Sequence, residues 1–239
     1  MPGTTRHGLE NSTYNTRAIE CADFAEELVA KGFVAESFAD VKDEATYQKI
    51  VDAYGGEDSE WAPHLDRLTY IYKAQTRFYE MLDAWRDGDI ETVRHSEPCL
   101  HIHVAVRNSD IPPPAASALA APSCPRASAR TQGCVAGTAQ VGSIFREDGV
   151  GLRDEYVISG PELETMCDIV RSVPGVLGER MLGGGDKGAS GCLVLAGAAE
   201  PVAEAVDTAY PRSRPEYADK YATHVVQICD GVTVFDGAL

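Results

Sequence analysis

The stretch Gly178-Glu-Arg-Met-Leu-Gly-Gly-Gly-Asp-Lys-Gly-Ala-Ser-Gly-Cys192 holds six glycines in fifteen residues. It lies between two apolar runs typical of strands, Val176 to Met181 and Cys192 to Ala196. Glycine permits positive φ angles and lets backbone amides approach a ligand closely, which suits anionic groups. The stretch therefore predicts a ligand-facing loop between two strands. Composition alone leaves open a hairpin loop without a ligand, and the order fits neither a Walker A loop nor a Rossmann fingerprint.

Helical periodicity dominates the chain on both sides of this loop. Apolar residues recur at helical spacing in Ala18 to Val29, Leu65 to Trp85, Leu163 to Val170 and Val202 to Ala209, with a shorter acidic segment around Tyr47 to Tyr54. Gly32 is placed to end the first helix, and Pro161 to begin a later one. Near the C-terminus, apolar runs flank Asp230-Gly231, a strong hairpin signal. This order predicts an α+β fold in which helices cover one side of an antiparallel sheet.

The charge balance favours a small-molecule partner. The chain has 37 acidic and 21 basic side chains, a net charge of -16, which repels nucleic acid and anionic membranes. No apolar run approaches the roughly 18 to 20 residues that cross a bilayer, and the first residues lack a signal-type apolar segment. We therefore expect a cytoplasmic protein that binds neither nucleic acid nor membrane. The seven cysteines form no Cys-x-x-Cys pair, so we expect reduced thiols and no zinc module.

Residues 93–140 differ in composition from the rest of the chain. They hold six of the thirteen prolines and three of the seven cysteines, and no Lys, Phe, Tyr or Trp. Asp89-Ile-Glu-Thr92 reads as a helix start without a helix, whereas the run from Val141 reads as a helix without a start. Joining Thr92 to Val141 places Ile90, Val141, Ile144 and Phe145 on one apolar stripe. We therefore expect a single domain made of 1–92 and 141–239, interrupted by a disordered Pro/Ala-rich insertion.

The ends of this segment suggest an origin in the gene. Val93 has a codon that begins with GT, and Gln140 can be encoded by CAG, which are the two ends of an intron. A retained intron is one hypothesis, and a long surface loop is the ordinary alternative. The histidines and cysteines within the segment fit no zinc spacing, so we predict no metal site there.

Three blocks of sequence resemble the galactokinase branch of the GHMP small-molecule kinases. Gly178, Arg180, Met181, Gly183, Gly184, Gly185 and Cys192 match the third motif of that family. Leu152-Arg-Asp-Glu-Tyr-Val-Ile-Ser-Gly-Pro-Glu-Leu163 is similar to the segment that precedes it. Arg6 to Arg17 matches the segment that carries a sugar-contacting tyrosine, which would be Tyr14. The blocks occur in the family's order and cover nearly all of the chain outside 93–140.

The resemblance implies a C-terminal GHMP kinase domain with a ferredoxin-like sheet. The site residues that it implies are Tyr14 for the sugar, Gly183, Gly184, Gly185, Gly188 and Gly191 in the glycine-rich loop, and Arg180 as support for that loop. The family transfers the γ-phosphoryl group of ATP, with Mg²⁺, to the C1 hydroxyl of galactose or a related sugar. The loop here departs from the family pattern, because Asp186 to Gly191 is three residues longer than the equivalent stretch.

The first and second motifs of the family occur nowhere in the sequence. They carry the Gly-Glu-His-x-Asp-Tyr sugar-binding string, the phosphate loop and the half with the catalytic aspartate, so we assign no catalytic residue and no metal ligand to this chain. The resemblance thus predicts part of a sugar kinase that is inactive alone. A non-catalytic sugar-binding or regulatory module, or a gene fragment, is the alternative. A domain without its partner exposes an apolar face, so we also expect self-association.

Overall fold

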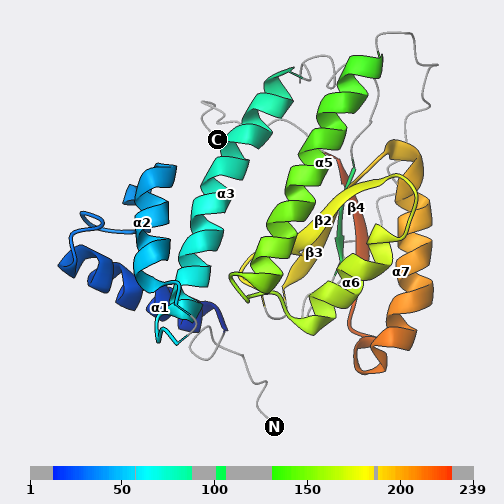
Figure 1. Cartoon of the computed structure of the whole chain (residues 1–239). Coiled ribbons are helices and arrows are strands. Elements are labelled where there is room, and N and C mark those ends of the chain that lie inside the picture. Colours follow the sequence, from blue (N-terminus) through cyan, green and yellow to red (C-terminus); the bar gives the residue numbers. More distant parts are fainter. Residues whose placement is uncertain (1–12, 57, 88–100, 106–130, 186–187, 228–239) are drawn as a thin grey trace, which may run out of the picture.

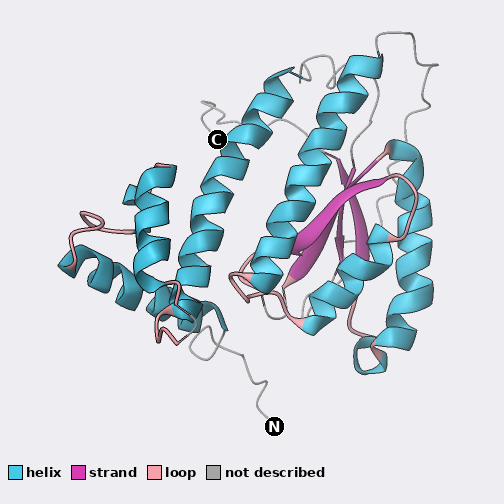
Figure 2. Ribbon diagram, viewed as in Figure 1, coloured by secondary structure: helices cyan, strands magenta, loops and turns pink. Residues whose placement is uncertain are grey.

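The computed structural model describes residues 13–56, 58–87, 101–105, 131–185 and 188–227 (Figure 1). Its helices are α1 (Thr13–Ala30), α2 (Glu44–Tyr54), α3 (Ala62–Asp87), α5 (Thr131–Asp154), α6 (Pro161–Arg171) and α7 (Ala199–Ser213). Its strands are β1 (His101–Ala105), β2 (Val176–Leu182), β3 (Ala189–Val194) and β4 (Thr223–Gln227). Figure 2 shows the strands gathered in one sheet, with helices beside it. Among the described residues, no helix is long and apolar enough to cross a membrane.

The first three helices pack on one another around an aromatic core. Phe24 of α1 lies at its centre and contacts the rings of Tyr54 at 5.2 Å and Trp61 at 5.3 Å between centroids. Leu28, Ile50 and Leu68 add fully buried aliphatic side chains from each of the three helices. Gly32 follows α1 with φ of 76°, the left-handed conformation expected of a glycine that ends a helix.

The sheet has four strands in the order β2-β3-β1-β4, and every neighbouring pair is antiparallel. β2 and β3 are joined directly by the glycine-rich loop, with Leu182 opposite Ala189 where the two strands leave the sheet. The predicted α+β class with an antiparallel sheet is therefore confirmed.

Helices cover both faces of this sheet rather than one. Cys192 and Val194 of β3 pack with α6 and α7, whereas Leu193 packs with α3 and α5. Successive side chains of a strand point to opposite faces, so these three residues require apolar cover on both. The prediction of one covered side was wrong, because helical periodicity shows that a helix has an apolar side but not which face of the sheet that side covers.

Segment 93–140 enters the fold at two places, which differs from the expected insertion. β1 lies between β3 and β4, and α5 begins at Thr131, ten residues before Val141. The alternating run His-Ile-His-Val-Ala suits a strand, whereas the run from Thr131 to Gln140 carries only a weak apolar stripe. The remaining parts of the segment lie outside the described residues. The expected partner strand of β4, after Asp230-Gly231, lies outside them too.

Candidate functional site

The glycine-rich loop turns sharply where it leaves β2. Gly183 and Gly185 both have φ of 79°, a conformation that side chains with a Cβ atom rarely adopt. A Cβ atom on Gly185 would lie 2.2 Å from the carbonyl oxygen of Ile158, so the loop rests directly on the backbone that precedes α6. The amide of Gly188 donates a hydrogen bond of 3.1 Å to the carbonyl of Gly185 and closes the turn. Gly183 and Gly185 thus adopt backbone conformations that suit glycine where the loop leaves β2, at the end of the sheet.

Tyr14 lies beside this loop, although it belongs to the first turn of α1. A Cβ atom on Gly184 would be 3.8 Å from Cδ2 of Tyr14, and the tyrosine side chain is 49% exposed. The structure therefore brings together two sequence-predicted site residues, Tyr14 and Gly184, that are 170 positions apart in the chain. A half-exposed aromatic ring next to exposed backbone amides can contact a ligand with one face while the loop binds its polar groups.

Tyr156 and Cys21 lie close to this position. The thiol of Cys21 and the hydroxyl of Tyr156 are 3.8 Å apart. Burial, and then the Cys21 thiol, raise the pKa of Tyr156 well above its ordinary value, so its phenol stays protonated at neutral pH. The Tyr156 ring packs on Tyr70 of α3 at 5.0 Å between centroids. These contacts join α1 and α3 to the segment between α5 and α6, on which Gly185 rests.

Arg180 holds the strand that leads into the loop. Its Nε donates a hydrogen bond of 3.0 Å to the carbonyl of Met181, and its Nη1 forms an ion pair with Asp148 of α5. The guanidinium group also lies over the Phe145 ring, 5.5 Å from the centroid. These contacts hold the C-terminal end of β2 against α5. None of them is a contact with the loop glycines. Gly191, the other end of the predicted loop, is buried in β3 opposite Arg180.

The comparisons with known proteins agree with one another. The chain is 32% identical over 210 residues to the galactokinase of Limosilactobacillus fermentum, which covers 88% of this chain and 40% of that protein. It is 39% identical over 69 residues to the Bos taurus galactokinase, 29% of this chain and 18% of that protein. The crystal structure of Lactococcus lactis galactokinase complexed with galactose superposes with a TM-score of 0.62 at 19% identity, covering 95% of this chain and 43% of that one.

The chain is a galactokinase-like GHMP kinase domain. No family model matches it, so the identification rests on these relatives and on the shared fold. The galactokinase-like domain spans less than half the length of the relatives that it matches, 40% of the Limosilactobacillus fermentum protein and 43% of the Lactococcus lactis chain. The activity and the substrates of a whole galactokinase are for that reason only proposals for this chain.

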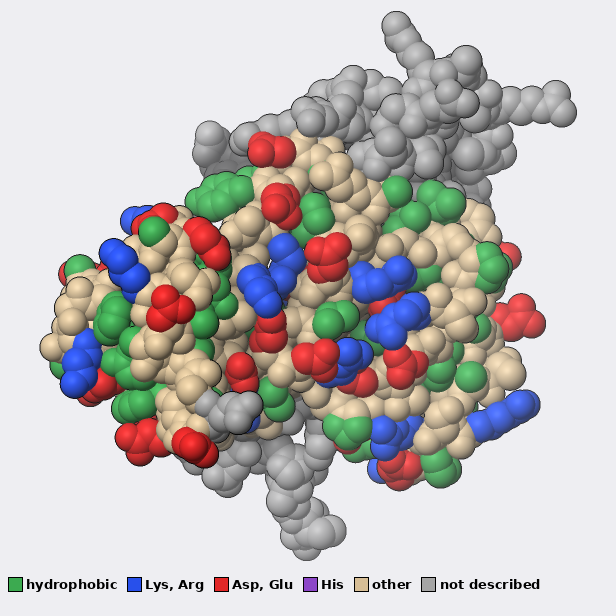
Figure 3. Space-filling model, in the orientation of Figure 1, with side chains coloured by type: hydrophobic (Ala, Val, Ile, Leu, Met, Phe, Trp, Pro, Cys, Tyr) green, Lys and Arg blue, Asp and Glu red, His purple; other side chains and the backbone are tan. Residues whose placement is uncertain are grey.

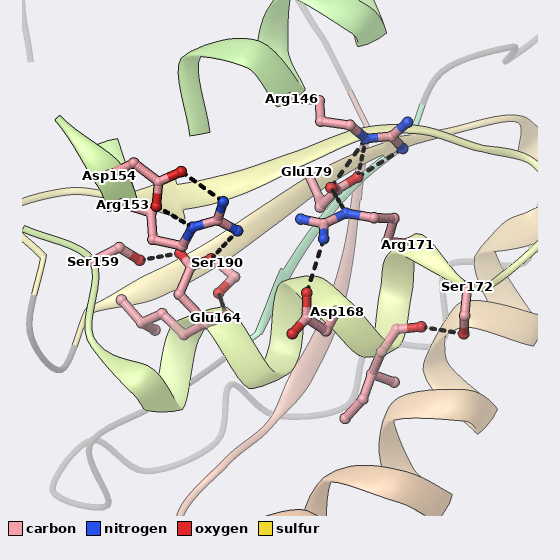
Figure 4. A network of polar contacts seen from close by, with 12 residues as sticks. Arg146, Arg153, Asp154, Ser159, Glu164, Asp168, Arg171, Ser172, Glu179 and Ser190 are labelled. Atoms are coloured by element: carbon pink, nitrogen blue, oxygen red, sulfur yellow. Dashed lines mark hydrogen bonds and ion pairs between the residues drawn. The ribbon is translucent and has the colours of Figure 1, made fainter. Parts of the chain in front are cut away.

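The galactokinase-like domain also contains a buried carboxylate that sequence reasoning missed. The Glu179 side chain in β2 is 0% exposed and lies between two arginines from different helices (Figure 4). Arg146 Nε is 3.0 and 2.9 Å from its two carboxylate oxygens, and Arg171 Nε is 2.6 Å from one of them. One carboxylate thus ties β2 to both α5 and α6 just before the loop. The signal available in the sequence was a pair of oppositely charged residues, Glu179 and Arg180, inside an otherwise apolar strand.

Three glycines, two on α5 and one on β2, allow α5 to lie directly on β2. A Cβ atom on Gly178 would be 1.9 Å from the carbonyl oxygen of Gly142, and one on Gly149 would be 2.7 Å from Cβ of Arg180. The glycine at the start of the family-like motif is therefore needed for helix-strand contact and not for the ligand. Gly142 and Gly149 are seven residues apart, so they lie on the same face of α5.

The described residues fit the phosphates of ATP better than they fit the Mg²⁺ that the family implies. Gly183 and Gly185 have positive φ and no side chain, so a phosphate would be able to approach the backbone of this turn closely. Among the described residues, no group of three or more His, Cys, Asp or Glu side chains could hold a metal ion. Lys187, a candidate charge near phosphates, lies outside the described residues. None of the described residues is therefore assigned as a Mg²⁺ ligand.

Proposed function

We propose that the chain forms the C-terminal part of an ATP-dependent sugar kinase that acts on the C1 hydroxyl of galactose or a related sugar, in the cytoplasm. In this proposal Tyr14 contacts the sugar, the amides of Gly183 to Gly185 face the nucleotide, and Arg180 holds β2 in place beneath the loop. The observation that supports it is the position of Tyr14 against Gly184, in a domain similar to galactokinases.

ATP with Mg²⁺ would supply the phosphoryl group, and such transfer depends mainly on positioning and on charge stabilisation around the phosphates. The residues of this chain bind and orient in that scheme, because the described part carries no assigned base and no metal cluster. Tyr156, whose pKa is raised by burial, packs against Tyr70 and Cys21 and has a positioning role in this proposal. We propose that the chain alone therefore has no kinase activity.

The test measures galactose 1-phosphate formed from galactose, ATP and Mg²⁺, by the chain alone and together with the part of Lactococcus lactis galactokinase that it does not match. We expect no product from the chain alone and product from the mixture. Tyr14→Ala should remove that activity, whereas Tyr79→Ala, at a more exposed tyrosine on α3, should leave it unchanged. Turnover by the chain alone would show that the site is complete without a partner.

A non-catalytic sugar-binding module is the second candidate, favoured by the incomplete coverage of the relatives. It predicts galactose binding by the isolated chain, with Tyr14 dependence, but no product in the mixture. A gene fragment without a role predicts neither binding nor activity, so the same assay separates the three cases.

We also propose self-association through α1. Ile19 is 60% and Val29 is 40% exposed on this helix, and a shallow groove lined by Cys21, Ala25 and Phe38 runs along it. Exposed apolar faces of this kind drive association in solution. Size-exclusion chromatography should give an oligomer that Ile19→Glu shifts to monomer, and a monodisperse wild-type monomer would exclude this role for α1.

For residues 93–140 we propose a retained intron. Its support is the change in composition and the codons that Val93 and Gln140 allow. In this proposal the His101–Ala105 strand occupies a position between β3 and β4 that the spliced protein fills differently or leaves open. Sequencing of genomic DNA and transcripts across both junctions tests it. A Gln140 codon other than CAG would exclude the intron.

A further inference from the structure

A second cavity lies away from the glycine loop, between α3 and α5, which run side by side in Figure 1. Its volume is about 400 Å³, within the range of about 300–1,000 Å³ that is usual for small-molecule sites. Its apolar wall is formed by Phe78, Met81, Ile144, Phe145 and Leu193. Phe78 is 52% exposed, so an aromatic side chain stands open at its edge.

The polar end of this cavity carries a fixed group of charges. Asp148 is buried there and forms ion pairs with two arginines, Arg77 with Nε 3.1 Å from Oδ1, and Arg180 through Nη1. The hydroxyl of Tyr70 donates a longer hydrogen bond of 3.4 Å to the same carboxylate. Burial raises the pKa of Tyr70 to about 12, so it is neutral at pH 7.

The charges at this end do not cancel. Among the described lining residues, two arginines face one aspartate, which leaves one net positive charge beside an apolar wall. Figure 3 shows positive and negative side chains interleaved over much of this face. The net charge at the polar end of the cavity therefore depends mainly on Arg77, Arg180 and Asp148, which line it. A pocket of this composition favours a ligand with a flat apolar body and one negative charge, because the anion offsets the excess while the ring displaces water from the wall.

We propose that this cavity is a binding site for a small aromatic monoanion, such as an aryl carboxylate. The ring lies between Phe78 and Ile144, and the carboxylate faces Arg77 and Arg180. The site is distinct from the Tyr14 and glycine-loop position. Two lining residues link it to that position. Arg180 Nε holds the Met181 carbonyl at 3.0 Å, and the Tyr70 ring packs on Tyr156, so occupancy of the cavity alters the support of the loop.

The experiment is isothermal titration calorimetry of the full chain with three probes that share one ring and differ in charge: 2-naphthoate, neutral 2-naphthamide and cationic 2-naphthylmethylammonium. We expect one molecule of 2-naphthoate per chain, bound about tenfold more tightly than the amide, which corresponds to one charge-assisted contact, and no binding of the cation. Equal affinity for the three probes, or no binding of 2-naphthoate at millimolar concentration, would overturn the proposal.

Matched variants on α5 and α3 locate the site. Ile144→Trp fills the cavity and should abolish binding, while Val150→Trp, an exposed position on the same helix outside the lining, should retain it. Met81→Trp fills the cavity from the α3 side and provides a second test if Ile144→Trp loses its helical circular dichroism. Arg77→Met should bring the preference for 2-naphthoate over the amide to about one. Binding that survives both Trp substitutions in the folded protein would place the ligand elsewhere.

Discussion

Replacing Glu179 by Gln tests whether the buried carboxylate holds β2 to its two helices. The substitution keeps the shape of the side chain but removes its charge, and turns one accepting oxygen into an NH₂ group that faces two guanidinium groups (Figure 4). Removal of one partner from a buried ion pair costs about 3–5 kcal/mol. Arg146 and Arg171 are 35% and 37% exposed, so water can solvate them after the change. We therefore expect the lower end, a loss of about 3 kcal/mol in the free energy of unfolding.

The assay is urea unfolding followed by far-UV circular dichroism, with Asp154→Asn as the matched control. Asp154 pairs with Arg153 at 2.7 Å, but its side chain is 53% exposed, and an exposed pair contributes only about 0–1 kcal/mol. Both substitutions remove one negative charge, so their difference reports burial and not net charge. If Glu179→Gln unfolds within about 0.5 kcal/mol of the wild type, an ordinary surface effect, the carboxylate does not tie β2 to α5 and α6.

Two further predictions concern the glycines of the loop and Tyr70 of α3. Alanine at Gly185 should destabilise the chain more than alanine at Gly183, because both have positive φ but only Gly185 meets the Ile158 carbonyl; Gly197→Ala, in open space without positive φ, should be neutral within about 0.5 kcal/mol. Thermal unfolding that ranks the three otherwise would refute the loop geometry. The pKa of Tyr70 is raised to about 12 in the folded chain, chiefly by burial, against about 10 when unfolded. Its contribution to stability is therefore complete below pH 10 and lost between pH 10 and 12, up to about 2–3 kcal/mol. Tyr70→Phe should flatten this alkaline loss and Tyr79→Phe should not, which unfolding series at pH 9 and pH 11 would check.

The sequence predicted the local elements where its signals are local. Pro161 begins α6 as expected, and Val176 to Met181 falls within β2. Both signals come from local backbone geometry. Proline has a fixed φ that suits the first turn of a helix, and the side chains of a strand alternate between its two faces. The glycine loop between β2 and β3 was predicted for the same reason, since only glycine suits the φ angles found at Gly183 and Gly185.

Long-range contacts were beyond the sequence pattern. The approach of Tyr14 to Gly184 depends on how α1 packs against the rest of the chain, and no periodicity encodes it; only the family resemblance placed both in one site. The ion pairs of Glu179 with Arg146 and Arg171 join β2, α5 and α6. The neighbours of each residue in the sequence give no sign of these contacts. The α5 start at Thr131 was missed because a Gly/Ala-rich run carries a weak apolar stripe.

An NMR titration of the ¹⁵N-labelled chain tests whether Tyr14 and the glycine loop form one ligand site. Galactose, and then ATP with Mg²⁺, are added while the amide signals of Gly183, Gly184 and Gly185 are followed. We expect these signals to shift, and we expect Tyr14→Ala to weaken the galactose response while Tyr79→Ala does not. Glycine signals that remain unchanged at saturating ligand, or shifts that are unaffected by Tyr14→Ala, would contradict a shared site.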